Sequence, residues 1–176
     1  MSSVIVTGGG GAIGQAIARR FSEDGRRVVC VDRDERVLDV CDELDDVVPC
    51  VVDLTADDAP GRVLPAAEEG GGAAVLVNNA GITRDGRALK LDLDDFRLVI
   101  RVNLVAPLRL AEAVAPRLSD GGSIINIASR AALGNFGQAN YVAAKSALVG
   151  ATRALAVQWA PVSASTRSRL GWWTPP

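Results

Sequence analysis

The strongest constraint on the fold is a regular alternation of short apolar runs and helix-like stretches. Five runs rich in β-branched residues are predicted to be strands: Ser3–Thr7, Arg27–Asp32, Val47–Asp53, Ala73–Asn79 and Gly122–Ser129. Each is almost continuously apolar, as expected for strands that helices cover on both faces. Helices are predicted at Ala12–Gly25, Glu35–Leu44, Asp57–Glu69, Asp92–Leu118 and Gln138–Ala160. This order predicts an α/β fold with a doubly wound parallel sheet and right-handed crossovers.

The signals at the helix ends support this assignment. Ile13, Ile17 and Phe21 fall on one face of the first predicted helix, which should stop at Gly25. The long fourth helix begins with acidic residues at 92–95, which favour a helix N-terminus. Its prolines, at positions 107 and 116, predict a kink or a late break.

Composition limits the classes of function. The 176 residues are 48% hydrophobic and carry a net charge of −2, so we expect one globular domain at 1–161, followed by an irregular tail at 162–176. Interspersed charges argue against a nucleic-acid partner, and no apolar run is long enough for a membrane span. The N-terminus lacks a signal-peptide pattern, and the three cysteines lack metal-type spacing, so we expect a cytoplasmic protein without a metal. The absence of histidine excludes every mechanism that needs an imidazole.

A glycine-rich loop lies where the first strand gives way to the first helix. Thr7–Gly14 reads TGGGGAIG, and such a loop at a helix N-terminus can turn sharply and bind a pyrophosphate. The alternative is a tight turn without a ligand. The loop is not a P-loop, because Gln15 stands where a lysine would be needed. Asp32 ends the second strand, where a carboxylate can bind ribose hydroxyls and repel a 2′-phosphate. This favours NAD(H), and Arg33 beside it leaves NADP(H) possible.

At this point the chain resembles the short-chain dehydrogenase/reductase family, with a Rossmann-like fold, from Val4 to about Ala160. Several spaced motifs carry the resemblance. Those that imply cofactor contacts are Thr7, Gly8, Gly10, Gly11, Ala12, Ile13 and Gly14 of the loop, Asp32 and Arg33, Asp53 and Leu54, and Asn79, Ala80 and Gly81 of the NNAG motif. Those that imply the catalytic set are Asn103, Ser129, Tyr141 and Lys145, of which the last two also imply cofactor contacts.

The physical chemistry of these residues agrees with the implied roles. Tyr141 and Lys145 are four residues apart on a predicted helix and so share one face. An ammonium beside a phenol favours the phenolate, so Tyr141 can exchange a proton with a carbonyl oxygen. The alternatives are a packing tyrosine and a solvated lysine, but Tyr141 is the only tyrosine in the chain.

The serine departs from the family pattern by one position. The family commonly places its catalytic serine thirteen residues before the tyrosine, whereas Ser129 precedes Tyr141 by twelve and Ala128 stands at thirteen. Alignment of the strand IINIAS favours Ser129, which would hydrogen-bond the substrate oxygen. In the family, the residue that matches Asn103 supports the lysine through a water.

Within the family, NNAGITRD and GNFGQANYVAAK resemble the 3-oxoacyl-[acyl-carrier-protein] reductases. This implies an oxidoreductase of fatty acid biosynthesis that reduces a 3-oxoacyl thioester. Alternatives are an alcohol, sugar or steroid dehydrogenase, and a non-catalytic remnant that only binds dinucleotide or oligomerises. The family forms dimers or tetramers through two long helices, here near Asp94–Leu118 and Gln138–Ala160.

The pattern of the family stops after Pro161. The tail Val162–Pro176 lacks helical or strand periodicity, so the sheet is expected to end at its fifth strand. The codons of Trp172, Trp173 and Thr174 read as Val-Asp when the frame starts at the third base of each codon. The same shift permits a Pro-Gly turn at the place the family expects. We therefore expect a frameshifted tail, which sequencing of the coding DNA tests; a Trp-rich recognition peptide is the alternative.

Overall fold

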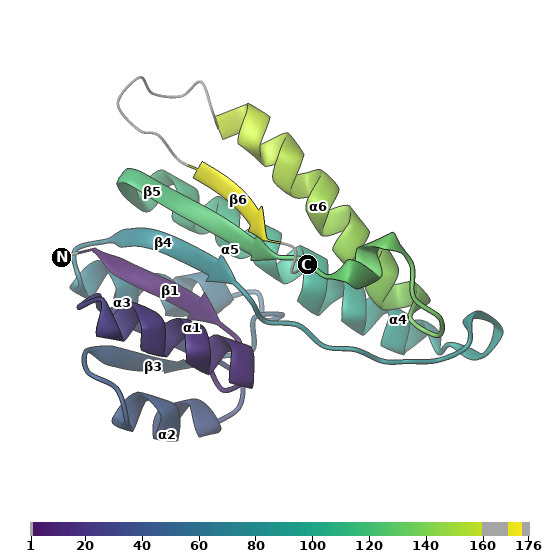
Figure 1. Cartoon of the computed structure of the whole chain (residues 1–176), viewed down its shortest axis with the longest axis horizontal. Helices are drawn as coiled ribbons and strands as arrows, with labels where there is room; N and C mark the ends of the chain where they lie inside the picture. The colour runs from purple at the N-terminus through teal and green to yellow at the C-terminus, as the bar shows by residue number, and fades with distance from the viewer. Residues whose placement is uncertain (1, 160–168, 174–176) are drawn as a thin grey trace.

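The computed structural model describes residues 2–159 and 169–173, which form a parallel sheet covered by helices on both faces (Figure 1). The strands are β1 (Ser3–Thr7), β2 (Val28–Asp32), β3 (Val47–Val51), β4 (Ala73–Asn78), β5 (Leu118–Ile127) and β6 (Arg169–Trp173). Within the described residues they form one six-stranded sheet in the order β3-β2-β1-β4-β5-β6, and all neighbours are parallel. The predicted doubly wound α/β fold is confirmed.

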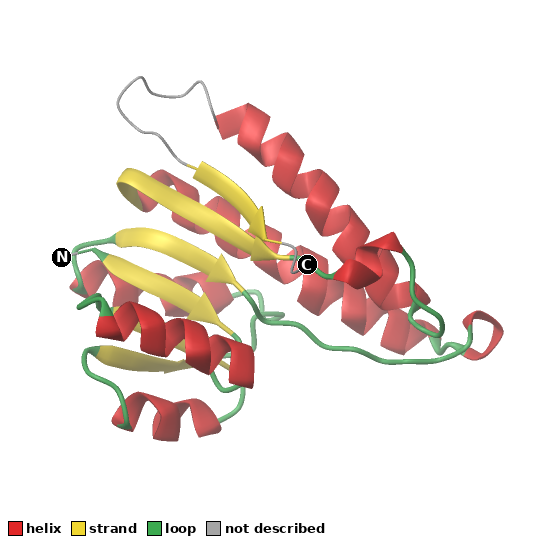
Figure 2. Ribbon diagram, in the orientation of Figure 1, coloured by secondary structure: helices red, strands yellow, loops and turns green. Residues whose placement is uncertain are grey.

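The helices lie close to their predicted places (Figure 2). They are α1 (Ala12–Glu23), α2 (Arg36–Asp42), α3 (Ala59–Glu69), α4 (Leu93–Ile100), α5 (Ala106–Val114) and α6 (Ala139–Trp159), with short 3₁₀ turns η1 (Ala88–Lys90), η3 (Ala115–Arg117) and η4 (Arg130–Leu133). A π-helical segment, η2 (Arg101–Val105), separates α4 from α5. This irregular segment directly precedes the first turn of α5, where Pro107 lacks the N–H that a regular helix would use. The helix predicted over 92–118 is thus irregular before Pro107 and ends in a 3₁₀ turn at Pro116, the two places where its prolines predicted a kink or a late break.

Side chains of strands β1 to β5 alternate between two buried clusters. In β1, Val4 and Val6 pack with residues of α1 and α2, whereas Ile5 faces the other way. The cluster around Ile5 includes residues of α3 and α5, and Trp159 at the end of α6 packs against it. This alternation explains why the strands are apolar throughout: both faces of the sheet are interior.

The structure has a sixth strand at 169–173, beyond the five predicted strands and within the segment predicted as an irregular tail. These residues form β6, which pairs with β5 in parallel from Ser123↔Arg169 to Ile127↔Trp173. The physical reason is that a buried strand such as β5 otherwise leaves a row of unpaired N–H and C=O groups at the sheet edge. The run RLGWW contains residues common in strands, and these five residues meet that need. The rest of the predicted tail, and the predicted end of α6 at Ala160, lie outside the described residues.

Residues 2–159 and 169–173 contain neither a membrane-spanning helix nor a cluster of metal ligands. There, no helix has both the length and the apolar character that a bilayer crossing requires. In the same ranges, no three His, Cys, Asp or Glu side chains come together as a set of metal ligands.

Candidate active site and cofactor cavity

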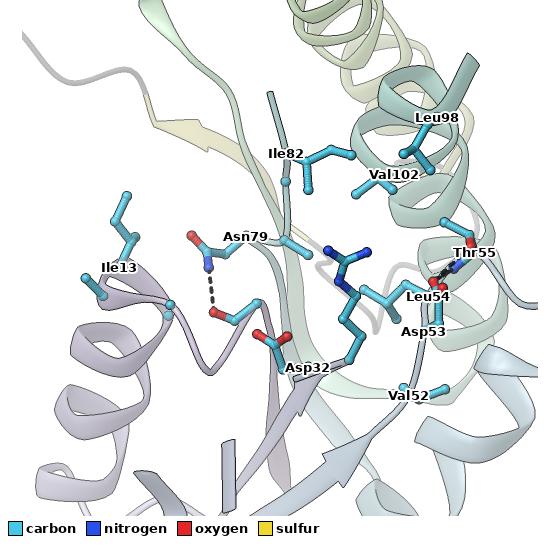
Figure 3. A pocket seen from close by; sticks show the side chains of 17 residues that line it. Ile13, Asp32, Val52, Asp53, Leu54, Thr55, Asn79, Ile82, Leu98 and Val102 are labelled. Atoms are coloured by element: carbon cyan, nitrogen blue, oxygen red, sulfur yellow. Dashed lines mark hydrogen bonds between the residues drawn. The ribbon is translucent and has the colours of Figure 1, made fainter. Parts of the chain in front are cut away.

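A cavity of about 430 Å³ opens at the carboxyl end of the sheet, between the glycine-rich loop and η2 (Figure 3). This is the edge where parallel α/β sheets usually bind ligands. The residues lining it are Gly8, Gly11, Ala12, Ile13, Gly14, Asp32, Arg33, Val52, Asp53, Leu54, Thr55, Asn79, Ala80, Gly81, Ile82, Leu98 and Val102.

The glycine-rich loop is packed so closely that side chains would not fit at several positions. Gly8 has φ +69°, and a Cβ on it would lie 2.9 Å from the Cα of Ala80. A Cβ on Gly14 would collide with the carbonyl oxygen of Gly8, so this glycine allows α1 to approach the loop. Ala12 and Ile13 occupy the first turn of α1, where N–H groups lack intrahelical acceptors. Ile13 is 64% exposed and borders the cavity, unlike the core face predicted for it with Ile17 and Phe21.

Asp32 holds the loop from the end of β2. Its Oδ2 accepts the N–H of Gly10 at 2.9 Å, and its Oδ1 accepts the N–H of Asp34 at 3.0 Å. Gly10 is thus part of the site through this bond, although it does not line the cavity. Each oxygen keeps further lone pairs, so the carboxylate can still accept from a ligand hydroxyl.

Thr7 does not line the cavity either, and its role is to join two loops. Its buried hydroxyl donates to Val77 O at 3.3 Å and accepts the N–H groups of Asn79 and Ala80, each at 3.0 Å. The amide of Asn79 donates back to Thr7 O at 2.9 Å. The NNAG motif and the glycine-rich loop therefore form one rigid wall.

The opposite wall follows β3. Asp53 Oδ1 accepts both the N–H and the hydroxyl of Thr55 at 2.8 Å, and these bonds lower the pKa of the Asp53 carboxyl. Figure 3 shows Asp53 and Thr55 across the cavity from Ile13. The sequence identified Asp53, Leu54 and Arg33 here. It missed the lining residues Val52, Thr55, Ile82, Leu98 and Val102, which carry no motif and are recognisable only by their position at the sheet edge.

Asn103 is fully buried in η2, and its amide is bonded to backbone. Its Nδ2 donates to Ile82 O at 2.8 Å and to Val99 O at 2.9 Å, and its Oδ1 accepts the N–H of Ile82 at 3.1 Å. A Cβ on Gly81 would lie 2.6 Å from this Oδ1. Asn103 therefore fixes the chain segment that follows the NNAG motif.

Lys145 and Tyr141 lie together on α6, as the spacing predicts. Lys145 is 3% exposed, and its Nζ donates to Ile127 O at 2.8 Å, at the end of β5. This Nζ is 5.8 Å from the centroid of the Tyr141 ring and 3.7 Å from where a Cβ on Gly81 would lie. Burial lowers the pKa of Lys145 to about 8. Lys145 thus adjoins the Gly81 end of the cavity, and Tyr141 lies beside Lys145.

Ser129 lies two residues beyond the carbonyl that accepts from Lys145. Its backbone is extended, and its Oγ accepts the N–H of Ala131 at 3.1 Å as the cap of η4. Ala128, the residue at the family's usual spacing, is 8% exposed, whereas Ser129 is half-buried. Ser129 is thus the better exposed of the two at this strand end.

The sequence model of the family described as short chain dehydrogenase matches residues 2–165. The chain belongs to the short-chain dehydrogenase family. Among curated relatives, it is 38% identical over 162 residues to the (2S)-[(R)-hydroxy(phenyl)methyl]succinyl-CoA dehydrogenase subunit BbsD of Thauera aromatica, covering 88% of this chain and 65% of the relative. It is 34% identical to the 3-oxoacyl-[acyl-carrier-protein] reductase FabG of Vibrio cholerae, covering 86% of this chain and 65% of that reductase.

Solved structures agree with the sequence relatives. A short-chain dehydrogenase/reductase from Brucella melitensis, described as a glucose/ribitol dehydrogenase, superposes with a TM-score of 0.90 at 32% identity, covering 99% of this chain and 74% of that one. This chain spans about 65% of the length of the curated relatives named above.

The residues that line the cavity of this chain fit a nicotinamide dinucleotide. The first turn of α1 offers N–H donors to a pyrophosphate, and the carboxylates of Asp32 and Asp53 offer acceptors to hydroxyl and amino groups. Lys145 lies at the other end of the cavity, beside Gly81. No group in this set conflicts with such a cofactor.

Proposed function

We propose that the chain is an NAD(P)-dependent oxidoreductase that reduces a ketone to a secondary alcohol, with NAD(H) preferred. The observation that carries this proposal is the buried Lys145, whose Nζ lies 5.8 Å from the Tyr141 ring and next to the Gly81 end of the cavity. A phenol and an ammonium next to this cavity would supply a proton donor beside a site for hydride transfer.

Tyr141 donates its proton to the carbonyl oxygen in the direction of reduction and takes it back in oxidation. A nicotinamide dinucleotide, when bound, would supply the hydride for the carbonyl carbon. Lys145 favours the phenolate that remains on Tyr141 and would hold the nicotinamide ribose. Ser129 hydrogen-bonds the carbonyl oxygen as negative charge develops on it. Asn103 holds the segment at Ile82 and supports Lys145 from η2.

The proposed substrate is a 3-oxoacyl thioester on acyl carrier protein or coenzyme A. This rests on the relatives that bear the names of 3-oxoacyl-[acyl-carrier-protein] reductases and of a CoA-ester dehydrogenase. A steroid alcohol is the second candidate substrate, because one relative, 37% identical, bears the name 12alpha-hydroxysteroid dehydrogenase.

The test mixes purified protein with NADH and acetoacetyl-CoA and follows NADH absorbance. Tyr141→Phe should lower kcat by about a hundredfold or more, because a positioned general acid contributes that much, and should leave NADH binding intact. Parallel reactions with a hydroxysteroid and NAD⁺ separate the two substrate classes. Cofactor binding without turnover on either class would contradict an enzyme and leave a dinucleotide-binding module.

We also propose a cytoplasmic homo-oligomer that associates through α4, α5 and α6. Exposed apolar side chains on or beside these helices, Leu93, Val105 and Val157, support this proposal. Sedimentation of the purified protein as a monomer at assay concentrations would contradict it.

A further inference from the structure

The segment after β4 runs as a long loop toward the start of α6 (Figure 1). It begins with Asn79–Ile82, which line the cofactor cavity, and hydrogen bonds hold it at several points. Near the cavity, Asn79 is bonded to Thr7, and Ile82 is bonded to Asn103. At its far end, Arg84 O accepts from the side chain of Asn140 at 2.9 Å. Two residues later in the same segment, Gly86 N donates to Gly137 O, just before α6, at 2.8 Å.

Asn140 is the one member of this series that lies on α6 itself. It is fully buried, and both polar atoms of its side chain are used. Nδ2 donates to Arg84 O, and Oδ1 accepts the N–H of Tyr141 at 2.8 Å. A buried amide is costly unless it is bonded in this way, so its two bonds define where the start of α6 lies.

Tyr141 needs such a support because of its place in the helix. It is the third residue of α6, in the first turn, where N–H groups lack intrahelical partners and helix ends fray. Its side chain is only half-buried, whereas Lys145, one turn later, is 3% exposed and bonded to β5. Burial therefore fixes the lysine, but the geometry of the first turn must fix the tyrosine.

We propose that Asn140 is a positioning residue for Tyr141: through Arg84 O it locks the first turn of α6 to the segment that borders the cofactor cavity. This inference rests on the proposed function in taking Tyr141 as the proton donor. It assigns to Asn140 no contact with substrate or cofactor. Its bond to Arg84 sets the distance from the Tyr141 ring to Lys145 and to the carbonyl that receives the proton.

Two variants separate the tie to Arg84 from the cap on the Tyr141 N–H. Asn140→Ala removes both bonds. Asn140→Asp keeps an oxygen for the Tyr141 N–H, at a helix N-terminus that favours negative charge, but in its ionised form it cannot donate to Arg84 O. The matched control is Gln138→Ala. Gln138 is partly exposed and joins the same two segments through Asp85, at 3.1 Å, without contacting Tyr141.

Two readouts are used, and one of them does not depend on turnover. Because Tyr141 is the only tyrosine, its ring signal is unambiguous in NMR spectra of protein with isotope-labelled tyrosine. We expect Asn140→Ala and Asn140→Asp to displace or broaden this signal, to lower kcat by about tenfold or more and to shift the pH dependence of kcat. The KM and Kd for NADH should stay within about twofold of wild type, as in Gln138→Ala.

Several results would overturn the inference. If both variants keep the ring signal and the pH profile of wild type, Asn140 has only a structural role. This conclusion holds even if the variants yield less active protein. Wild-type behaviour of Asn140→Asp beside an impaired Asn140→Ala would make the residue a helix cap alone. If wild type lacks turnover, the proposed function fails, and the ring signal alone then decides the inference.

Discussion

Lys145 should make the stability of the protein depend on pH in an unusual direction. Burial lowers its pKa from the ordinary 10.5 to about 8 in the folded chain. Between these two values the unfolded chain binds more protons than the folded one, so the free energy of unfolding rises with pH. Below about pH 8 both states carry the ammonium, and its burial opposes folding by a constant amount.

The magnitude follows from the size of the shift. Each unit of pKa difference corresponds to about 1.4 kcal/mol, so the change from pH 8 to 10.5 amounts to ~3 kcal/mol. The perturbation is Lys145→Met, which keeps the length of the side chain and removes the titrating group. Urea unfolding of both proteins, at half-unit steps of pH, gives the difference in unfolding free energy between them.

Taking the difference removes the contributions of groups that titrate in this range independently of Lys145. Burial raises the pKa of the Cys50 thiol, for example, so the unfolded chain loses that proton first and stability falls with pH. Cys50 lies in β3 and is present in both proteins, so its contribution cancels. A wild-type advantage that rises from pH 8 to 10.5 supports the buried lysine. A flat difference would show that Lys145 titrates as a solvated side chain, and a falling one would show that bonding to Ile127 O outweighs burial.

Two further predictions concern the glycine-rich loop. A Cβ on Gly9 would collide with the buried Sγ of Cys30, so Gly9→Ala should destabilise the fold by about 2 kcal/mol. Cys30→Ala should recover part of that loss, and strictly additive effects in a double-mutant cycle measured by urea unfolding would contradict the contact. Asp32→Ala removes an acceptor from Gly10 and from the ribose, so calorimetric titration should show NADH binding weakened by about tenfold and NADPH binding by less. Equal losses for both cofactors would mean that Asp32 serves only the loop.

Much of the fold could be predicted because both faces of the sheet are interior. Runs such as SVIVT and the 3.6-residue spacing of Ile17 and Phe21 record burial directly in the sequence. The strand at 169–173 could not be predicted in this way. Its pairing depends on the free edge that β5 presents, which belongs to another part of the chain and leaves no periodicity in five residues.

The site divides in the same manner. Gly14 and Gly8 were predictable because a backbone that approaches another backbone tolerates only glycine. Val102 and Leu98 were not, because an apolar residue that lines a cavity has the same pattern as one that lies in the core. Asn140 stood beside a recognised tyrosine, but only its burial and its bond to Arg84 O distinguish it from a solvated amide.

Three buried side chains at the carboxyl edge of the sheet, those of Thr7, Asn103 and Asn140, make their hydrogen bonds to backbone groups. Thr7 holds Asn79, Asn103 holds Ile82, and Asn140 holds Arg84. Each of these bonds holds one residue of a connecting segment in place. Without the bond, the conformation of that segment would depend on its own sequence alone. The same kind of hydrogen bond therefore positions both the wall of the cavity and Tyr141, the proposed proton donor. A variant that removes the bond from Asn140 to Arg84 O should consequently lower kcat more than the affinity for the cofactor, which many separate contacts share.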